Sequence, residues 1–130
     1  MGIVGIIVAG LAGFAFGAVW YSILARSWMA VSGVPVENGQ PANRADPVPY
    51  VLGLISAVLV AAMLAFVFAR AGVDGAGEGF VWGLGAGLFI AAPWLVTCYG
   101  FAARPRPLMA IDAGYATFGS AMIGLVLGLF

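Results

Sequence analysis

The sequence contains no histidine and no lysine, and only 8% of its 130 residues are charged. Without histidine, the chain has no imidazole base, no histidine ligand for a metal and no histidine-ligated haem. Cys98 is the single cysteine, which excludes an internal disulfide and a metal site built from cysteine pairs. Five arginines balance five acidic residues, so there is no basic patch of the kind that binds nucleic acid. From these absences we expect neither enzymatic activity nor a cofactor.

Apolar residues are abundant instead and make up 64% of the chain. A soluble domain of this size would need far more charge to cover its surface, so most of the chain is expected to contact membrane lipid. Four runs are long enough to span about 30 Å of hydrocarbon as helices that rise about 1.5 Å per residue. These runs predict a single integral membrane domain over residues 1–130, an all-α bundle of four transmembrane helices. The predicted helices are residues 2–24, 49–70, 79–101 and 108–130.

A short amphipathic segment follows the first predicted helix, at residues 25–33. Its Trp28 and Met29 favour lipid, whereas Arg26 and Ser27 favour water, which is typical of a segment lying at the membrane interface. The polar, proline-rich loop over residues 34–48 is then interpreted as a tether.

Glycines recur at intervals of three or four residues along several of the predicted helices. This spacing places them on one face of each helix, where they allow a neighbouring helix to approach closely. The predicted packing positions are Gly13, Gly17, Gly83, Gly87, Gly114, Gly124 and Gly128.

The third predicted helix has two special features. Gly85 lies about 200° around the helix from Gly83, so small residues mark two faces. We therefore expect this helix to lie between neighbours. Pro93 in its second half cannot donate a backbone hydrogen bond to Phe89, which predicts a kink.

Two aromatic residues, Trp20 and Tyr21, end the first predicted helix on its glycine face. One interpretation is a packing seam with aromatic residues at the membrane interface. The alternative is a ligand groove floored by glycine and walled by these two side chains. The residues alone leave both open.

Asp112 is the only carboxylate inside an apolar run, about 6–8 Å past the start of the fourth predicted helix. One hypothesis is an ion pair or hydrogen bond that holds this helix to the end of the first, with Tyr21 or Ser22 taking part. The other is a proton- or ion-handling role, since carboxylates inside membranes mark such pathways. The arginines expected on the same side of the membrane are Arg26, Arg104 and Arg106.

Arginine distribution predicts the orientation of the chain. Four of the five arginines lie in residues 25–48 and 102–107, and the fifth, Arg70, ends the second predicted helix on the other side. Because positively charged loops stay inside, we expect these two segments to be cytoplasmic and both termini to be outside.

Two motifs resemble signatures of the DUF1761 family of small bacterial membrane proteins. The first is Gly-Ala-Val-Trp-Tyr-Ser at residues 17–22, followed by Ser-Trp-Met at 27–29. The second is Ile-Asp-Ala-Gly-Tyr at residues 111–115, with Met-Ile-Gly at 122–124. The sequence departs from the family pattern at Ile23, where proline is frequent, and at Ala116, where histidine or glutamine is frequent.

The resemblance implies a four-helix protein of unknown function in the bacterial inner membrane. It also implies a common cluster of structural or functional side chains: Trp20, Tyr21, Ser22, Arg26, Trp28, Asp112 and Tyr115.

The excess of small-residue faces favours an accessory or scaffold subunit that packs against itself or a larger membrane complex. The rival hypothesis is a small dimeric transporter or channel in which Asp112, Tyr115 and Tyr21 line a path. Neither hypothesis requires a metal, a cofactor or a nucleic acid.

Overall fold

The computed structural model describes residues 2–130, and four of its helical segments are long and apolar enough to cross a membrane. These segments are Ile3–Ile23, Val48–Ala71, Ala76–Phe101 and Arg106–Gly128. They confirm the prediction of an all-α protein with four spans, and their bounds lie within a few residues of those expected.

The first, second and fourth spans are single helices: α1 (Ile3–Ile23), α3 (Val48–Ala71) and α6 (Arg106–Gly128). The third span consists of α4 (Ala76–Ala86), the π-helix η1 (Gly87–Ala91) and α5 (Ala92–Phe101). Glycine sets the turn between α3 and α4, where Gly72 and Gly75 have φ angles of 70° and 87°. Only glycine adopts such angles without strain, so the chain reverses there.

A π-helix directly precedes Pro93, where the sequence predicted a kink. In η1 the N–H of Ala92 bonds to the carbonyl of Gly87, five residues earlier. Proline lacks an N–H and its ring crowds the preceding turn, and a single wide turn accommodates both effects. The extra residue of this turn also changes how α5 is rotated relative to α4.

The connection between α1 and α3 is more ordered than a tether. It begins with the short helix α2 (Ala25–Ser32) at the predicted interfacial segment. A hairpin then pairs β1 (Val36–Glu37) with β2 (Gln40–Pro41). Its turn residues Asn38 and Gly39 both have positive φ angles, as a tight two-residue hairpin turn requires. The Asn-Gly pair is a hairpin signal that the interpretation as a tether overlooked.

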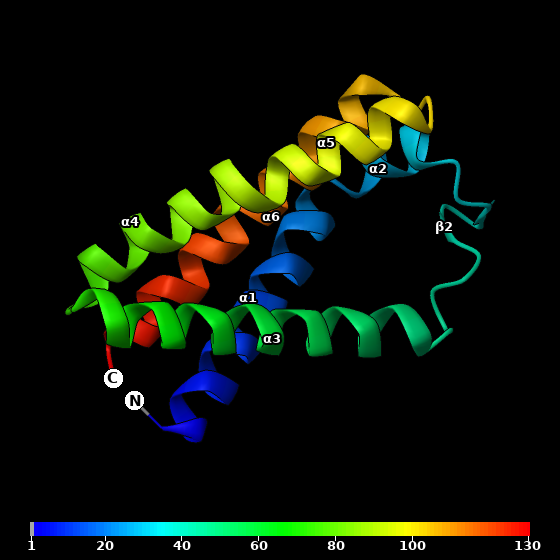
Figure 1. The fold of residues 1–130 in the computed structure, drawn as a ribbon. Helices are drawn as coiled ribbons and strands as arrows, with labels where there is room; N and C mark the ends of the chain where they lie inside the picture. Colours follow the sequence, from blue (N-terminus) through cyan, green and yellow to red (C-terminus); the bar gives the residue numbers. More distant parts are fainter. Residues whose placement is uncertain (1) are drawn as a thin grey trace.

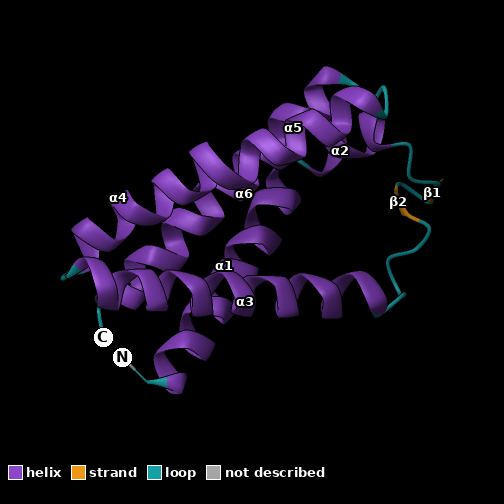
Figure 2. Cartoon of the chain, in the orientation of Figure 1, coloured by secondary structure: helices purple, strands orange, loops and turns teal. Residues whose placement is uncertain are grey.

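The fourth span, α6, lies at the centre of the bundle and contacts each of the other helices (Figures 1 and 2). The expectation that the third span is enclosed on two sides is wrong. Gly83 packs on α6, but a Cβ atom added to Gly85 would meet nothing within 4 Å. Small residues mark a face that a neighbour can approach; they do not show that a neighbour is present.

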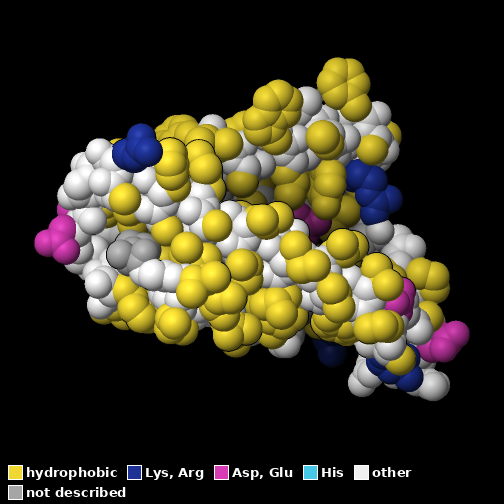
Figure 3. Space-filling view, turned by 60° about the horizontal axis from the view of Figure 1, so that its bottom comes forward, with side chains coloured by type: hydrophobic (Ala, Val, Ile, Leu, Met, Phe, Trp, Pro, Cys, Tyr) yellow, Lys and Arg dark blue, Asp and Glu magenta, His cyan; other side chains and the backbone are white. Residues whose placement is uncertain are grey.

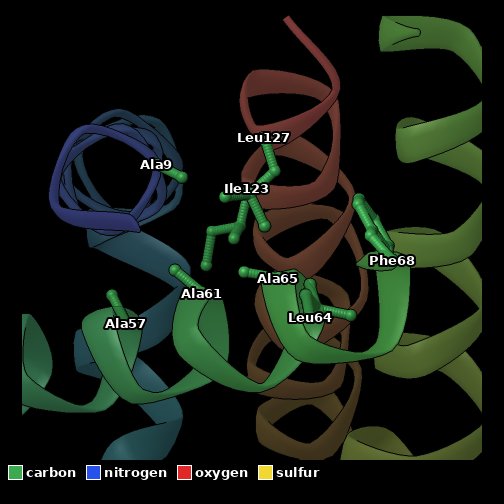
Figure 4. Close-up of a cluster of buried hydrophobic side chains, with 8 residues drawn as sticks. All are labelled: Ala9, Ala57, Ala61, Leu64, Ala65, Phe68, Ile123 and Leu127. Atoms are coloured by element: carbon green, nitrogen blue, oxygen red, sulfur yellow. The ribbon is translucent and has the colours of Figure 1, made fainter. Parts of the chain in front are cut away.

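The hydrophobic core joins α1, α3 and α6 (Figure 4). Ala9 and Ala61 are completely buried, as is Leu127, and Phe68 is 1% exposed. Small residues on α1 and α3 let these two helices cross closely, while the larger side chains of α6 fill the remaining space.

Each predicted packing glycine lies against another part of the chain, within the part of the sequence that is described. Gly13 and Gly17 meet side chains of α6, and Gly114 meets the ring of Trp20. The other contacts are between backbones: Gly83, Gly87, Gly124 and Gly128 lie in the packing of η1, α4 and the preceding turn against α6. We call this region, where α4 and η1 pack on residues 116–128, the tight end.

Large apolar side chains cover the outside of the bundle (Figure 3). Phe89 and Trp94 on the third span are 76% and 71% exposed, and Ile3 on the first is 74% exposed. Such a surface is suited to lipid, because exposed apolar area of this extent is costly in water.

Candidate functional site

Asp112 joins three spans through two tyrosines. The hydroxyl of Tyr21, near the end of α1, donates a hydrogen bond of 2.5 Å to one carboxylate oxygen. The hydroxyl of Tyr99, on α5, donates one of 2.6 Å to the other oxygen. Hydrogen bonds to a carboxylate are shorter and stronger than those between neutral groups. The arrangement therefore holds α1 and α5 to α6 at the depth of Asp112.

Aromatic rings surround this carboxylate. Tyr21 has its ring 5.4 Å from that of Tyr115 and 6.2 Å from that of Trp28, both in edge-to-face geometry. The Tyr115 hydroxyl donates a hydrogen bond of 3.2 Å to the carbonyl of Gly13 on α1. The edge-to-face arrangement is the one that ring quadrupoles favour.

Trp20 closes the other side of the α1–α6 contact. Its ring lies against Gly114, where a Cβ atom would be 2.6 Å from the nearest ring carbon. Its indole N–H donates a hydrogen bond of 3.0 Å to the carbonyl of Ile111. Trp20 therefore packs between helices and is absent from the cleft lining described below, unlike its neighbour Tyr21.

The remaining residues of the predicted cluster do not bond to Asp112. The hydroxyl of Ser22 donates to the carbonyl of Ala18, within its own helix. Arg26 is exposed. Arg104 donates to the carbonyl of Ser32 and so fastens α2 to the start of α6.

The arginine pairing suggested for Asp112 is replaced by tyrosine pairing. Within residues 2–130, the hydrogen-bond donors to this carboxylate are Tyr21 and Tyr99. Asp112 is six residues into α6, about 9 Å from its start, whereas Arg104 precedes that helix. A phenol hydroxyl supplies a donor at this depth without moving a second charge out of water.

The carboxylate lies in a cleft of 860 Å³. Figure 3 shows the hollow, with acidic atoms visible inside it. Gln40, Asn43 and Arg44, which are exposed, line its mouth beside the hairpin. The walls come from α1, α2, the start of α3, α5 and α6. The other residues that line the cleft include Phe14, Gly17, Tyr21, Ser22, Trp28, Tyr50, Leu95, Tyr99, Asp112, Tyr115 and Ala116.

The charged groups that line the cleft are Asp112 and Arg44. The Arg44 guanidinium donates a hydrogen bond of 3.1 Å to the carbonyl of Pro41, in the exposed loop. The Tyr50 hydroxyl donates to the carbonyl of Arg44 at 2.9 Å and ties that loop to α3. The positive charge is thus at the mouth, and the negative charge is inside.

Sequence reasoning missed Tyr99. The alternative of a groove floored by glycine agrees with the cleft at Gly17 and Tyr21, but Trp20 is not part of its lining. The signal for Tyr99 was weak: a polar aromatic residue near the end of an apolar span, on a helix whose rotation is changed by η1. No group of three or more histidine, cysteine, aspartate or glutamate side chains lies together within residues 2–130.

Four spans and a cleft with an interior carboxylate define a multi-pass membrane protein. The chain belongs to the DUF1761 family, described as a protein of unknown function, whose family profile matches residues 4–128. This match confirms the resemblance inferred from residues 17–29 and 111–124. No curated protein and no solved structure gives a match.

Proposed function

We propose that the protein is a small transporter whose solute-binding site is the cleft around Asp112. The observation that carries this proposal is a carboxylate within a membrane span, at the inner part of an 860 Å³ cleft whose mouth is lined by exposed polar residues. Ionisable groups are costly within a membrane and are kept there where they act on an ion or a solute.

The filled interior beyond the cleft favours a carrier over an open channel. Past the inner end of the cleft, Gly13 on α1 lies directly against Ile123 on α6. Ala61 of α3, which is fully buried, belongs to the same core. A solute in the cleft therefore reaches one face of the membrane in this conformation, as a carrier requires between its two states.

The third span supplies a place for movement. The π-helix η1 lies between α4, which packs at the tight end, and α5, which carries Tyr99 in the cleft. Interruptions of this kind are common at functional sites in helices, because a π-turn exchanges with an α-turn by a change in hydrogen bonding. Rotation of α5 at η1 would change the bond between Tyr99 and Asp112.

The seven predicted packing glycines, which helped to motivate the scaffold hypothesis, contact other parts of the same chain, whereas a Cβ atom at Gly85 would meet nothing within 4 Å. The scaffold role stays a prediction. Homo-oligomerisation and partner binding stay predictions. The transporter proposal is argued from the cleft of a single chain.

Sided cysteine labelling tests the carrier proposal without knowledge of the solute. The lone Cys98, which is exposed, is first replaced by alanine. Cysteine is then introduced at Ala116 in the inner cleft or, as a matched control, at Asn43 in the mouth. A membrane-impermeant quaternary-ammonium thiosulfonate is applied to either face of sealed vesicles.

We expect A116C to react from both faces and N43C to react from one face only. The membrane face from which N43C reacts also tests the prediction that residues 25–48 lie on the cytoplasmic side of the inner membrane. Labelling of A116C only from the face that labels N43C, or from neither face, would contradict the carrier proposal.

A further inference from the structure

The inner cleft combines one negative charge with aromatic walls and few free hydrogen-bond donors. We propose that it binds a monovalent organic cation with an apolar body, with the cationic group held against Asp112. This inference rests on the proposed role of the cleft as a solute site and adds the chemical class of the solute.

The negative charge of Asp112 favours a cationic solute. Each oxygen of Asp112 accepts one hydrogen bond from a tyrosine, and a carboxylate oxygen has capacity for a second. Two phenol donors stabilise the carboxylate but do not neutralise it. Arg44, the cationic side chain of the lining, is bound to Pro41 in the exposed loop at the mouth. A cation inside the cleft would supply the missing positive charge at low dielectric.

The aromatic walls of the cleft also favour a cation. Rings of six aromatic residues line the cleft, and the faces of such rings are electronegative. Organic cations are held by several aromatic faces together, and a nearby carboxylate adds to this attraction. The rings are Phe14, Tyr21, Trp28, Tyr50, Tyr99 and Tyr115.

Most hydrogen-bond donors in the inner cleft are already bonded within the protein. The hydroxyls of Tyr21 and Tyr99 donate to Asp112, and that of Tyr115 donates to the Gly13 carbonyl. The Ser22 hydroxyl donates to Ala18. Binding an anion or a sugar here would break these bonds, because such solutes need several donors. The indole N–H of Trp28 is one neutral donor and does not balance a negative charge.

The volume of the cleft suits an organic molecule. The volume of 860 Å³ falls within the range of clefts that bind molecules of drug size, about 300–1,000 Å³. A bare metal ion or ammonium would leave the apolar walls unfilled. The geometry therefore points to a cationic head at Asp112 and an apolar body along Phe14 and Leu95.

Equilibrium binding of radiolabelled benzyltrimethylammonium to the detergent-purified protein tests this inference. We expect saturable binding that excess unlabelled benzyltrimethylammonium displaces and that benzylsulfonate, similar in size and opposite in charge, does not. We expect D112N, which keeps the shape of the side chain, to lower the affinity at least about tenfold. D112E keeps the charge and should retain binding within about threefold of wild type.

Equal displacement by benzylsulfonate, unchanged binding in D112N, or no saturable binding to the wild-type protein would overturn the inference. If D112N does not fold, the comparison of the two ligands on wild type and the D112E result decide the matter. Failure of this inference and failure of the transporter proposal are distinguishable. Two-sided labelling of A116C without cation binding indicates a carrier for another solute class, whereas cation binding with one-sided labelling indicates a binding site that does not alternate.

Discussion

The two ends of the bundle are built on opposite principles. At the tight end, glycines bring the backbones of α4 and α6 together, and a Cβ atom on Gly83 would lie 3.0 Å from the Cα atom of Ala121. At the other end, α3 and α5 diverge (Figure 1), and aromatic side chains line the cleft between them. Helix α6 thus uses one stretch of its length to pack the helices together and another to line the cleft. Its later part fixes the helices, and its earlier part, with Asp112 and Tyr115, faces the cleft.

The largest effect on stability is expected at the tight end. G83A places a methyl group against the backbone of α6, and we expect it to lower the free energy of unfolding by about 1–3 kcal/mol. G85A, two residues away, is the matched control, because a Cβ atom there meets nothing within 4 Å. Denaturation in mixed micelles measures both. Equal losses in the two variants would contradict the assignment of the tight end.

The next effect is expected at the carboxylate. D112A leaves the hydroxyls of Tyr21 and Tyr99 without their acceptor, and we expect a loss of about 1–2 kcal/mol. D112N keeps one acceptor oxygen and should lose less. Thermal unfolding in detergent provides the measurement, and unchanged stability in both variants would show that Asp112 does not hold the helices together.

The smallest effect distinguishes an interior tyrosine from one at the mouth. Y99F removes one donor from Asp112, and we expect a loss of about 0.6–1.5 kcal/mol. Y50F removes an exposed hydrogen bond to Arg44 and should change stability by less than about 0.5 kcal/mol. A double-mutant cycle of Y99F with D112A isolates the pair, because alanine removes the acceptor. A coupling energy of zero would argue against the bond between them.

The sequence predicted the four spans well because lipid imposes long apolar runs that end at glycine, proline or arginine. It also pointed to Asp112 and Tyr21, because a carboxylate in an apolar run needs a partner and few polar side chains lie at its depth. The spacing of residues fixes the face of one helix and leaves the neighbour on that face undetermined. For this reason the glycine positions were identified, whereas the expectation of an enclosed third span was wrong.

The place of Tyr99 in the cleft was beyond the reach of sequence patterns for a related reason. Helical periodicity assumes a constant turn, and η1 breaks that assumption between Gly87 and Ala91. Positions beyond it are rotated relative to any extrapolation from α4. Arg104 and Arg106, two of the arginines expected near Asp112, lie before and at the start of α6, at least six residues from the carboxylate, and Arg104 donates to the carbonyl of Ser32 instead.

The π-turn has a genetic consequence. The π-turn contains one amino acid more than a regular helix that rises the same distance. The direction in which α5 faces therefore depends on the number of codons between Gly87 and Tyr99. Loss of one codon within η1 would remove the extra amino acid and leave a regular helix that still directs Tyr99 toward Asp112. An α-turn formed without that loss would instead turn Tyr99 about 100° away from Asp112. In this protein, the alignment of the third span with the carboxylate is therefore set by chain length as well as by residue identity.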